Sequence, residues 1–167
     1  MGMPIKSNDW VVHPRHGVGR VVQLEMRQFG STDRQMYYLI ALQTGTLWVP
    51  VGGPPSGLRK LTAKTELGRY REVLKGRPDP LPREHRERRN TLIERVNDGS
   101  FLARCEAVRD LTALGWRKAL SETDSALLRK TRGELCTEWA AAVGRSVAEA
   151  SHEVDTLLLD GRMVHEK

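Results

Sequence analysis

The sequence predicts an α+β protein in which a small N-terminal β-barrel, residues 1–62, precedes a C-terminal five-helix bundle, residues 63–167. Two observations predict this division. Short segments rich in β-branched and aromatic residues fill the first 62 residues and are separated by glycine and proline turns. Beyond residue 62, apolar residues recur every three or four positions, which is the period of amphipathic helices.

Five short strands are expected in the N-terminal part, and such closely spaced strands are typical of an SH3- or Tudor-like barrel. A barrel of this size is too small for a buried active site, but its edge strands can pair with another protein. Turn residues at 14–17, 30–31, 44–45 and 52–55 separate the strands. The expected strands are 10–12, 17–27, 36–42, 47–51 and 58–61.

The first two helices are separated by a segment that proline keeps from being helical. The first expected helix has apolar residues at positions 67, 70, 73 and 74 and ends near Gly76. Residues 77–82 contain three prolines, each of which disfavours the α conformation in the residue before it. The second helix is expected to start at Pro82 or Arg83 and to stop at Gly99, because glycine fits a left-handed helix cap.

Serine residues mark the starts of the last three helices. Ser100 is expected to cap the third helix, and the pairs Ser121 with Asp124 and Ser146 with Glu149 resemble capping boxes for the fourth and fifth. Gly144 is expected to end the fourth helix. The apolar faces of these helices contain Leu102, Cys105, Val108, Leu111, Leu127, Leu128, Leu135, Trp139, Val147, Ala150, Val154 and Leu157.

The net charge of +6 is concentrated in the first hundred residues. Residues 1–62 contain seven basic and three acidic side chains, and residues 63–100 contain ten and seven. Residues 101–167 contain ten and eleven. This distribution favours a partner that is a polyanion or an acidic protein, although a basic surface that serves only solubility is the alternative.

The sequence offers no signature of catalysis, metal binding or membrane insertion. Gly17-Val18-Gly19 lacks the third glycine and the following helix of a dinucleotide site, so it predicts a turn or bulge. Cys105 and Cys136 lie among apolar neighbours and are expected to be buried free thiols. We expect a cytoplasmic, monomeric protein that is not an enzyme, has no cofactor or metal, and does not bind membranes.

Several short motifs resemble the CarD/CdnL/TRCF family of bacterial transcription regulators. The resemblance begins at residues 9–20, DWVVHPRHGVGR, and continues through LWVPV at 47–51 and GLR at 57–59. It extends into the helical part through LPR at 81–83, NDGS at 97–100 and AVRDL at 107–111. Because it spans nearly the whole chain, a transcription-repair coupling helicase, in which the barrel is one module of a far larger protein, is excluded.

The resemblance implies a mechanism in which the barrel binds the β subunit of RNA polymerase. The helical domain would contact promoter DNA at the upstream edge of the opening bubble and so stabilise open complexes. The barrel would dock by an exposed strand edge that accepts another strand. Alternatives are that Trp48 packs into the barrel or against the helical domain, and that Arg27 is an ordinary solvated strand residue. By position, the resemblance assigns polymerase binding to Arg27, Leu47, Trp48, Val49 and Pro50.

The family places a tryptophan near the start of the second helix, where it wedges into the minor groove. Alignment from either side, from Gly99 or from residues 81–83, puts His85 at that position. Imidazole is smaller and more polar than indole, so it offsets less of the unstacking cost. It can instead donate a hydrogen bond or, when protonated, add charge beside phosphates. The DNA-binding residues implied by the resemblance are Arg83, His85, Arg86, Arg88 and Arg89.

Three interpretations of this helix stay open. It contacts DNA with a weakened wedge, it belongs to a polymerase-binding paralogue that has lost most DNA affinity, or its charges are a solvated surface. Two other classes of protein also stay open. One is an adaptor whose helical bundle binds a protein instead of DNA, and the other is an RNA-binding SH3-like module, for which clustered exposed aromatic residues are lacking.

Overall fold

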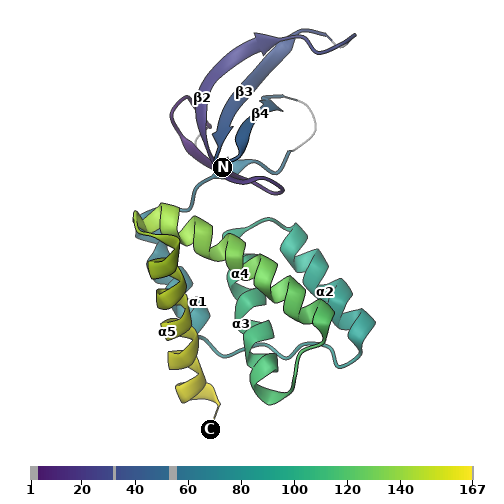
Figure 1. Ribbon diagram of the computed structural model, residues 1–167, viewed down its shortest axis with the longest axis vertical. Helices are drawn as coiled ribbons and strands as arrows, with labels where there is room; N and C mark the ends of the chain where they lie inside the picture. Colours follow the sequence, from purple (N-terminus) through teal and green to yellow (C-terminus); the bar gives the residue numbers. More distant parts are fainter. Residues whose placement is uncertain (1–3, 32, 53–55, 167) are drawn as a thin grey trace. The chain divides into compact units, whose positions relative to one another are not determined.

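The computed structural model describes residues 4–31, 33–52 and 56–166. The chain divides into two compact units, Met1–Leu61 and Thr62–Lys167 (Figure 1). The Leu61 N–H donates to the Trp10 carbonyl in the first unit, and the Thr62 N–H donates to the Glu138 carboxylate in the second. The residues on either side of the boundary are therefore each anchored in their own unit.

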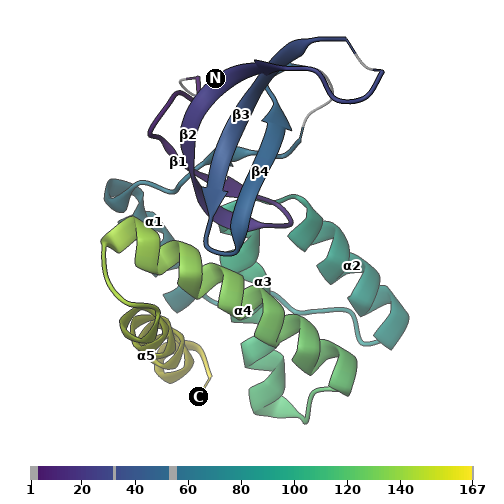
Figure 2. The ribbon, with the colours of Figure 1, turned by 45° about the horizontal axis from the view of Figure 1, so that its top comes forward.

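The first unit is a five-stranded antiparallel sheet with the strand order β4-β3-β2-β1-β5. Figure 2 shows β2, β3 and β4 side by side, with β4 at the edge of the sheet. This sheet and the helices that follow confirm the predicted fold class, a small Tudor-like β domain followed by a helical domain. The strands are β1 Trp10–His13, β2 Gly17–Arg27, β3 Gln35–Leu42, β4 Gly45–Pro50 and β5 Arg59–Lys60.

The core of the sheet is formed by one face of the first four strands. Val11, Val21, Ile40 and Val49 are buried there, which is the face that their alternation along the strands predicts. Gly19 lies opposite Leu42, and a Cβ atom at Gly19 would lie 2.6 Å from the Ile40 side chain. The glycine therefore lets β2 and β3 approach closely. Residues 17–19 were expected to form a turn or bulge, but they belong to β2, and the break in register lies between Val21 and Gln23.

The second unit contains five α-helices and a short 3₁₀ helix, Lys64–Glu66. The second helix begins at His85, two or three residues after the predicted start at Pro82 or Arg83. The reason is that the Glu84 carboxylate accepts the N–H groups of Arg86 and Glu87 and so caps the helix. The α-helices are α1 Leu67–Lys75, α2 His85–Asn97, α3 Phe101–Arg117, α4 Glu122–Val143 and α5 Val147–His165.

The helix caps follow the sequence with one exception. Ser146 and Glu149 form the expected reciprocal capping box at the start of α5. Ser121 caps α4 by accepting the Asp124 N–H, but the Asp124 carboxylate pairs with Arg88 and does not return to the cap. The expected capping box at this position is therefore half formed.

The main helical core lies among α1, α3, α4 and α5 and is centred on the fully buried Trp139, as predicted. Both views show α5 next to α1, with α2 on the other side of α3 (Figures 1 and 2). A second, smaller cluster of Leu92, Ala107 and Leu111 attaches α2 to α3. Cys105 and Cys136 are buried free thiols, as expected, and burial raises the pKa of both. In the described part of the chain, no helix has the length and apolar character needed to cross a membrane.

Candidate functional site

The β4 strand forms an open edge of the sheet. Within the described residues, β4 pairs with β3 and with no other strand. The Val51 N–H donates to the Met36 carbonyl at 2.9 Å, which fixes the alternation of bonds along this pair. The backbone groups of Thr46 and Trp48 consequently face away from β3. They can accept a strand added from outside.

An aromatic cluster with one cation lies on the sheet face beside this edge. The Arg27 guanidinium lies 4.5 Å from the centre of the Trp48 ring. Phe29 packs near both Trp48 and Tyr37, with ring centres 6.2 Å and 5.0 Å apart. Arg27 also lies 3.7 Å from the Glu25 carboxylate, and both side chains are well exposed. The result is a surface that combines aromatic area with a positive charge. The expectation that the N-terminal unit lacks a cluster of exposed aromatic residues is therefore corrected, since Phe29 is 42% exposed.

The predicted polymerase-binding residues divide between the two faces of the sheet. Trp48 is half-buried and Pro50 is exposed, and Arg27 lies against Trp48. Val49 is 3% exposed in the core, and Leu47 packs against that core. The assignment of Leu47 and Val49 is therefore corrected for their side chains, because alternate strand residues point to opposite faces. Their backbone still belongs to the edge strand.

Buried ion pairs fix the non-helical segment before α2. The Asp110 carboxylate has no exposed surface and accepts hydrogen bonds from Arg95, Arg109 and the Asp79 N–H, at 2.8, 2.8 and 3.0 Å. Arg109 also pairs with the Asp79 carboxylate at 3.1 Å. This network holds the segment that leads into α2 against α3.

Arg88 differs from its prediction as a DNA-binding residue. It is 5% exposed, its guanidinium pairs with the Asp124 carboxylate at 2.9 Å, and it donates to the carbonyls of Pro82 and Arg83. These contacts attach the first turn of α2 to the first turn of α4. The prediction of a DNA contact is corrected on this ground, because the buried guanidinium has no surface to offer a phosphate.

The other predicted DNA-binding residues are exposed. Arg83, Arg86 and Arg89 form no ion pair within the described part of the chain, so their charges are available to an anion. His85 is also exposed, and its Nδ1 atom lies 3.4 Å from Arg88. The capping bonds from the Arg86 and Glu87 backbone hold the pKa of the Glu84 carboxyl below its usual range. A negative charge therefore lies among these cations.

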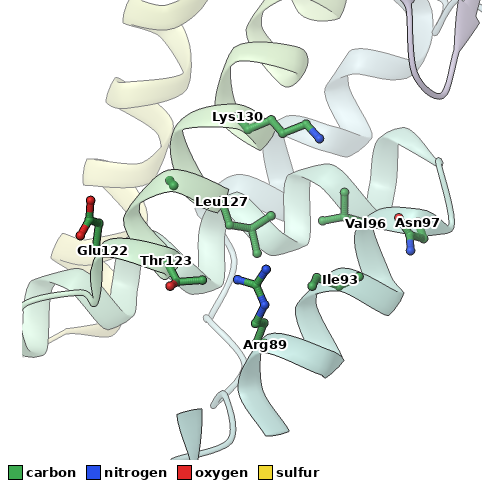
Figure 3. A pocket seen from close by; sticks show the side chains of 9 residues that line it. Arg89, Ile93, Val96, Asn97, Glu122, Thr123, Leu127 and Lys130 are labelled. Carbon is green, nitrogen blue, oxygen red and sulfur yellow. The ribbon is translucent and has the colours of Figure 1, made fainter. Parts of the chain in front are cut away.

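A groove of about 650 Å³ lies between α2 and α4 (Figure 3). Figure 3 shows the Arg89 side chain directed into the groove toward Leu127, with Lys130 on the opposite helix. Sequence reasoning missed the α4 side of this groove, since its residues lie at least 25 positions beyond the end of α2 and have no distinctive spacing. The groove has an apolar floor of Ile93, Val96 and Leu127, and a charged rim of Arg89, Lys130 and Glu122.

An open-edged antiparallel sheet followed by a helical unit with exposed cations defines a two-domain binding protein. Residues 5–62 match the CarD-like/TRCF RID domain, and residues 69–155 match the CarD C-terminal domain. The chain therefore belongs to the CarD-like family, whose members are non-enzymatic transcription regulators that act with the transcription machinery. The predicted family membership is confirmed.

A relative in Bacillus subtilis strain 168 has the name "Putative transcription factor YdeB". It is 27% identical to this chain over 125 residues, which cover 72% of this chain and 80% of the relative. The similarity includes most of both proteins and agrees with the family assignment.

Proposed function

We propose that this protein binds the β subunit of RNA polymerase through the open edge of β4 and promoter DNA through the exposed cations at the start of α2. It acts by binding alone, at the upstream edge of the transcription bubble, and changes the stability of open complexes. A single copy beside the polymerase, in the cytoplasm, is the form that this proposal requires.

The observation that carries the proposal is the unpaired side of β4 in a domain that matches the RID model. Outward backbone groups at Thr46 and Trp48 supply hydrogen bonds to an added strand. Trp48 beside Arg27 supplies an aromatic anchor and a positive charge on the same surface. Aromatic and arginine side chains contribute much of the binding energy at protein interfaces.

The DNA part of the proposal is supported by the exposed cations of α2 and of the residues before it. Arg83 and Arg86 are available to phosphates, and such contacts position a protein on DNA without reading sequence. Affinity that depends on these contacts falls as the salt concentration rises, because the release of counterions from DNA is then less favourable. The corrected place of Arg88 reduces the number of arginines that serve this role from four to three.

A proline in the edge strand tests the polymerase contact. Thr46→Pro removes an N–H that faces the open side and leaves the bonds from β4 to β3 in place, because proline is tolerated on edge strands. Association with the isolated polymerase β subunit, measured by biolayer interferometry, should weaken about tenfold, since each lost interface hydrogen bond costs roughly 1–3 kcal/mol.

The matched control for this experiment is Thr46→Ala, which keeps the N–H and should bind within about twofold of the parent. Circular dichroism verifies that both variants keep the sheet. Equal binding by the proline and alanine variants would remove strand addition at β4 from the proposal.

A second candidate function is a polymerase-binding adaptor with little DNA affinity. The observations that favour it are the burial of Arg88 and the histidine at position 85, where the family has its wedge tryptophan. Pull-down of the polymerase with and without promoter DNA separates the two functions. A regulator of open complexes is retained more strongly when the DNA is present, whereas an adaptor is retained equally.

A further inference from the structure

We propose that the groove between α2 and α4 binds one unpaired nucleotide of single-stranded DNA. The base would lie on the apolar floor, and the adjoining phosphates would lie between Arg89 and Lys130. This inference rests on the proposed DNA-binding function and deepens it by naming an unstacked nucleotide as the ligand.

The floor of the groove fits the face of a nucleobase. Ile93, Val96 and Leu127 are partly buried, and Val96 and Leu127 pack against the small core that attaches α2 to α3. They therefore form a fixed apolar surface. Bases that leave the duplex stack are held by aromatic or apolar side chains against their faces and by hydrogen bonds at their edges. The Asn97 amide and the Thr123 hydroxyl, which also line the groove, can supply those bonds.

The charge of the groove fits a phosphate-bearing ligand. Arg89 and Lys130 line the groove from α2 and α4, on either side of Leu127 in Figure 3, and neither forms an ion pair within the residues that the structure describes. Glu122 is the acidic residue among those lining the groove, so the lining has a net positive charge. An anion that bridges Arg89 and Lys130 neutralises two cations that the protein leaves uncompensated.

The groove continues the proposed DNA surface along one helix. Arg86, Arg89, Ile93 and Asn97 follow one another at intervals of three or four residues, so they form one stripe on α2. A strand whose phosphates contact Arg86 and Arg89 is thereby led to the apolar floor at Ile93. A paired base cannot use this floor, because its faces are already stacked within the duplex.

Three DNA probes test the inference with the full-length chain. One is a forked duplex with a single unpaired nucleotide, the second is the same fork with an abasic site at that nucleotide, and the third is a fully paired duplex. Fluorescence anisotropy should give a Kd for the fork about tenfold below the values for the other two, because only the fork offers a base face that the apolar floor can bury.

A charge placed in the groove should abolish this preference. Ala126 is exposed on α4 and lines the groove, so Ala126→Glu adds repulsion there without disturbing a core. The fork and the abasic fork should then bind the variant within about twofold of each other. Ala141→Glu is the matched control, because Ala141 is also exposed on α4 but does not line the groove, and it should keep the tenfold preference.

Each other outcome has a distinct meaning. Equal binding of all three probes by the parent protein overturns the inference and leaves the proposed DNA binding intact. No binding of any probe at low salt overturns both. If Ala126→Glu lowers association with the polymerase and leaves the preference for the fork unchanged, the groove holds a protein segment and the inference is wrong.

Discussion

The ion pair of Arg88 with Asp124 shows that arginines of the same helix differ in role: Arg88 is buried and structural, whereas Arg86 and Arg89 are exposed. Five residues between positions 83 and 89 are arginine or histidine, and the sequence gives no obvious reason to separate them. The Arg88 side chain is buried because it lies on the face of α2 that packs against α4, in line with Leu92. One oxygen of Asp124 is bonded, while Oδ1 has no hydrogen-bond partner among the described residues.

Replacement of one partner of this pair should lower the stability of the helical unit, whereas replacement of both should lower it much less. Arg88→Met leaves the Asp124 carboxylate buried without its cation, and we expect a loss of about 3–5 kcal/mol in the free energy of unfolding of the helical unit. The double variant Arg88→Met with Asp124→Leu should recover most of that loss. Urea denaturation followed by the far-ultraviolet helical signal measures both variants, and equal losses would show that the pair is not coupled.

His85 occupies the position at which the resemblance to the family predicts a wedge tryptophan. Under the proposed function, His85→Trp should lengthen the lifetime of open complexes, because indole replaces more of the base stacking that melting removes. The matched control is His152→Trp, an exposed histidine on α5, which should leave the lifetime unchanged. A lifetime that does not increase with His85→Trp would show that this position is not the wedge.

At the scale of elements, turn and cap residues made the helices predictable, whereas contacts between helices were not. Ser100, Ser121 and Ser146 each accept an N–H in the first turn of a helix, as their positions in the sequence indicate. The start of α2 differs from the prediction because Pro82 is compatible with a first helical turn, but the Glu84 side chain is the group that caps the helix. The groove between α2 and α4 depends on tertiary packing, which periodicity does not encode.

The crossing of α1 and α5 depends on one glycine. A Cβ atom at Gly161 would lie 2.8 Å from the Lys75 carbonyl oxygen, and the backbone there cannot swing aside. We expect Gly161→Ala to destabilise the helical unit by about 1–3 kcal/mol. Gly133→Ala is the control: nothing lies within 4 Å of its Cβ position in α4, so it should stabilise by about 0.5–1 kcal/mol.

The same urea titration measures both glycine variants. A stabilising effect of Gly161→Ala would mean that α5 can move away from α1 at little cost. The contrast between the two positions is useful because both glycines lie within helices, where helix propensity alone predicts that alanine is favoured.

At the scale of the whole molecule, the sequence predicted the two-part architecture because each part has its own hydrophobic period. The predicted change from strands to helices after residue 62 lies one residue from the division into the units Met1–Leu61 and Thr62–Lys167. Surfaces were harder to predict than architecture. Leu47 and Val49 were assigned to an interface because they belong to the right strand, but which strand face turns inward depends on the register with β3.

Under the proposed function, the open side of β4 makes this protein one of several possible competitors for a single site on the polymerase. A strand edge has room for a single added strand, so occupancy by one ligand excludes every other. Any protein that presents a comparable edge to the same segment of the enzyme must compete with this chain for it. The cellular abundance of this protein relative to such competitors would then set which of them each polymerase molecule holds.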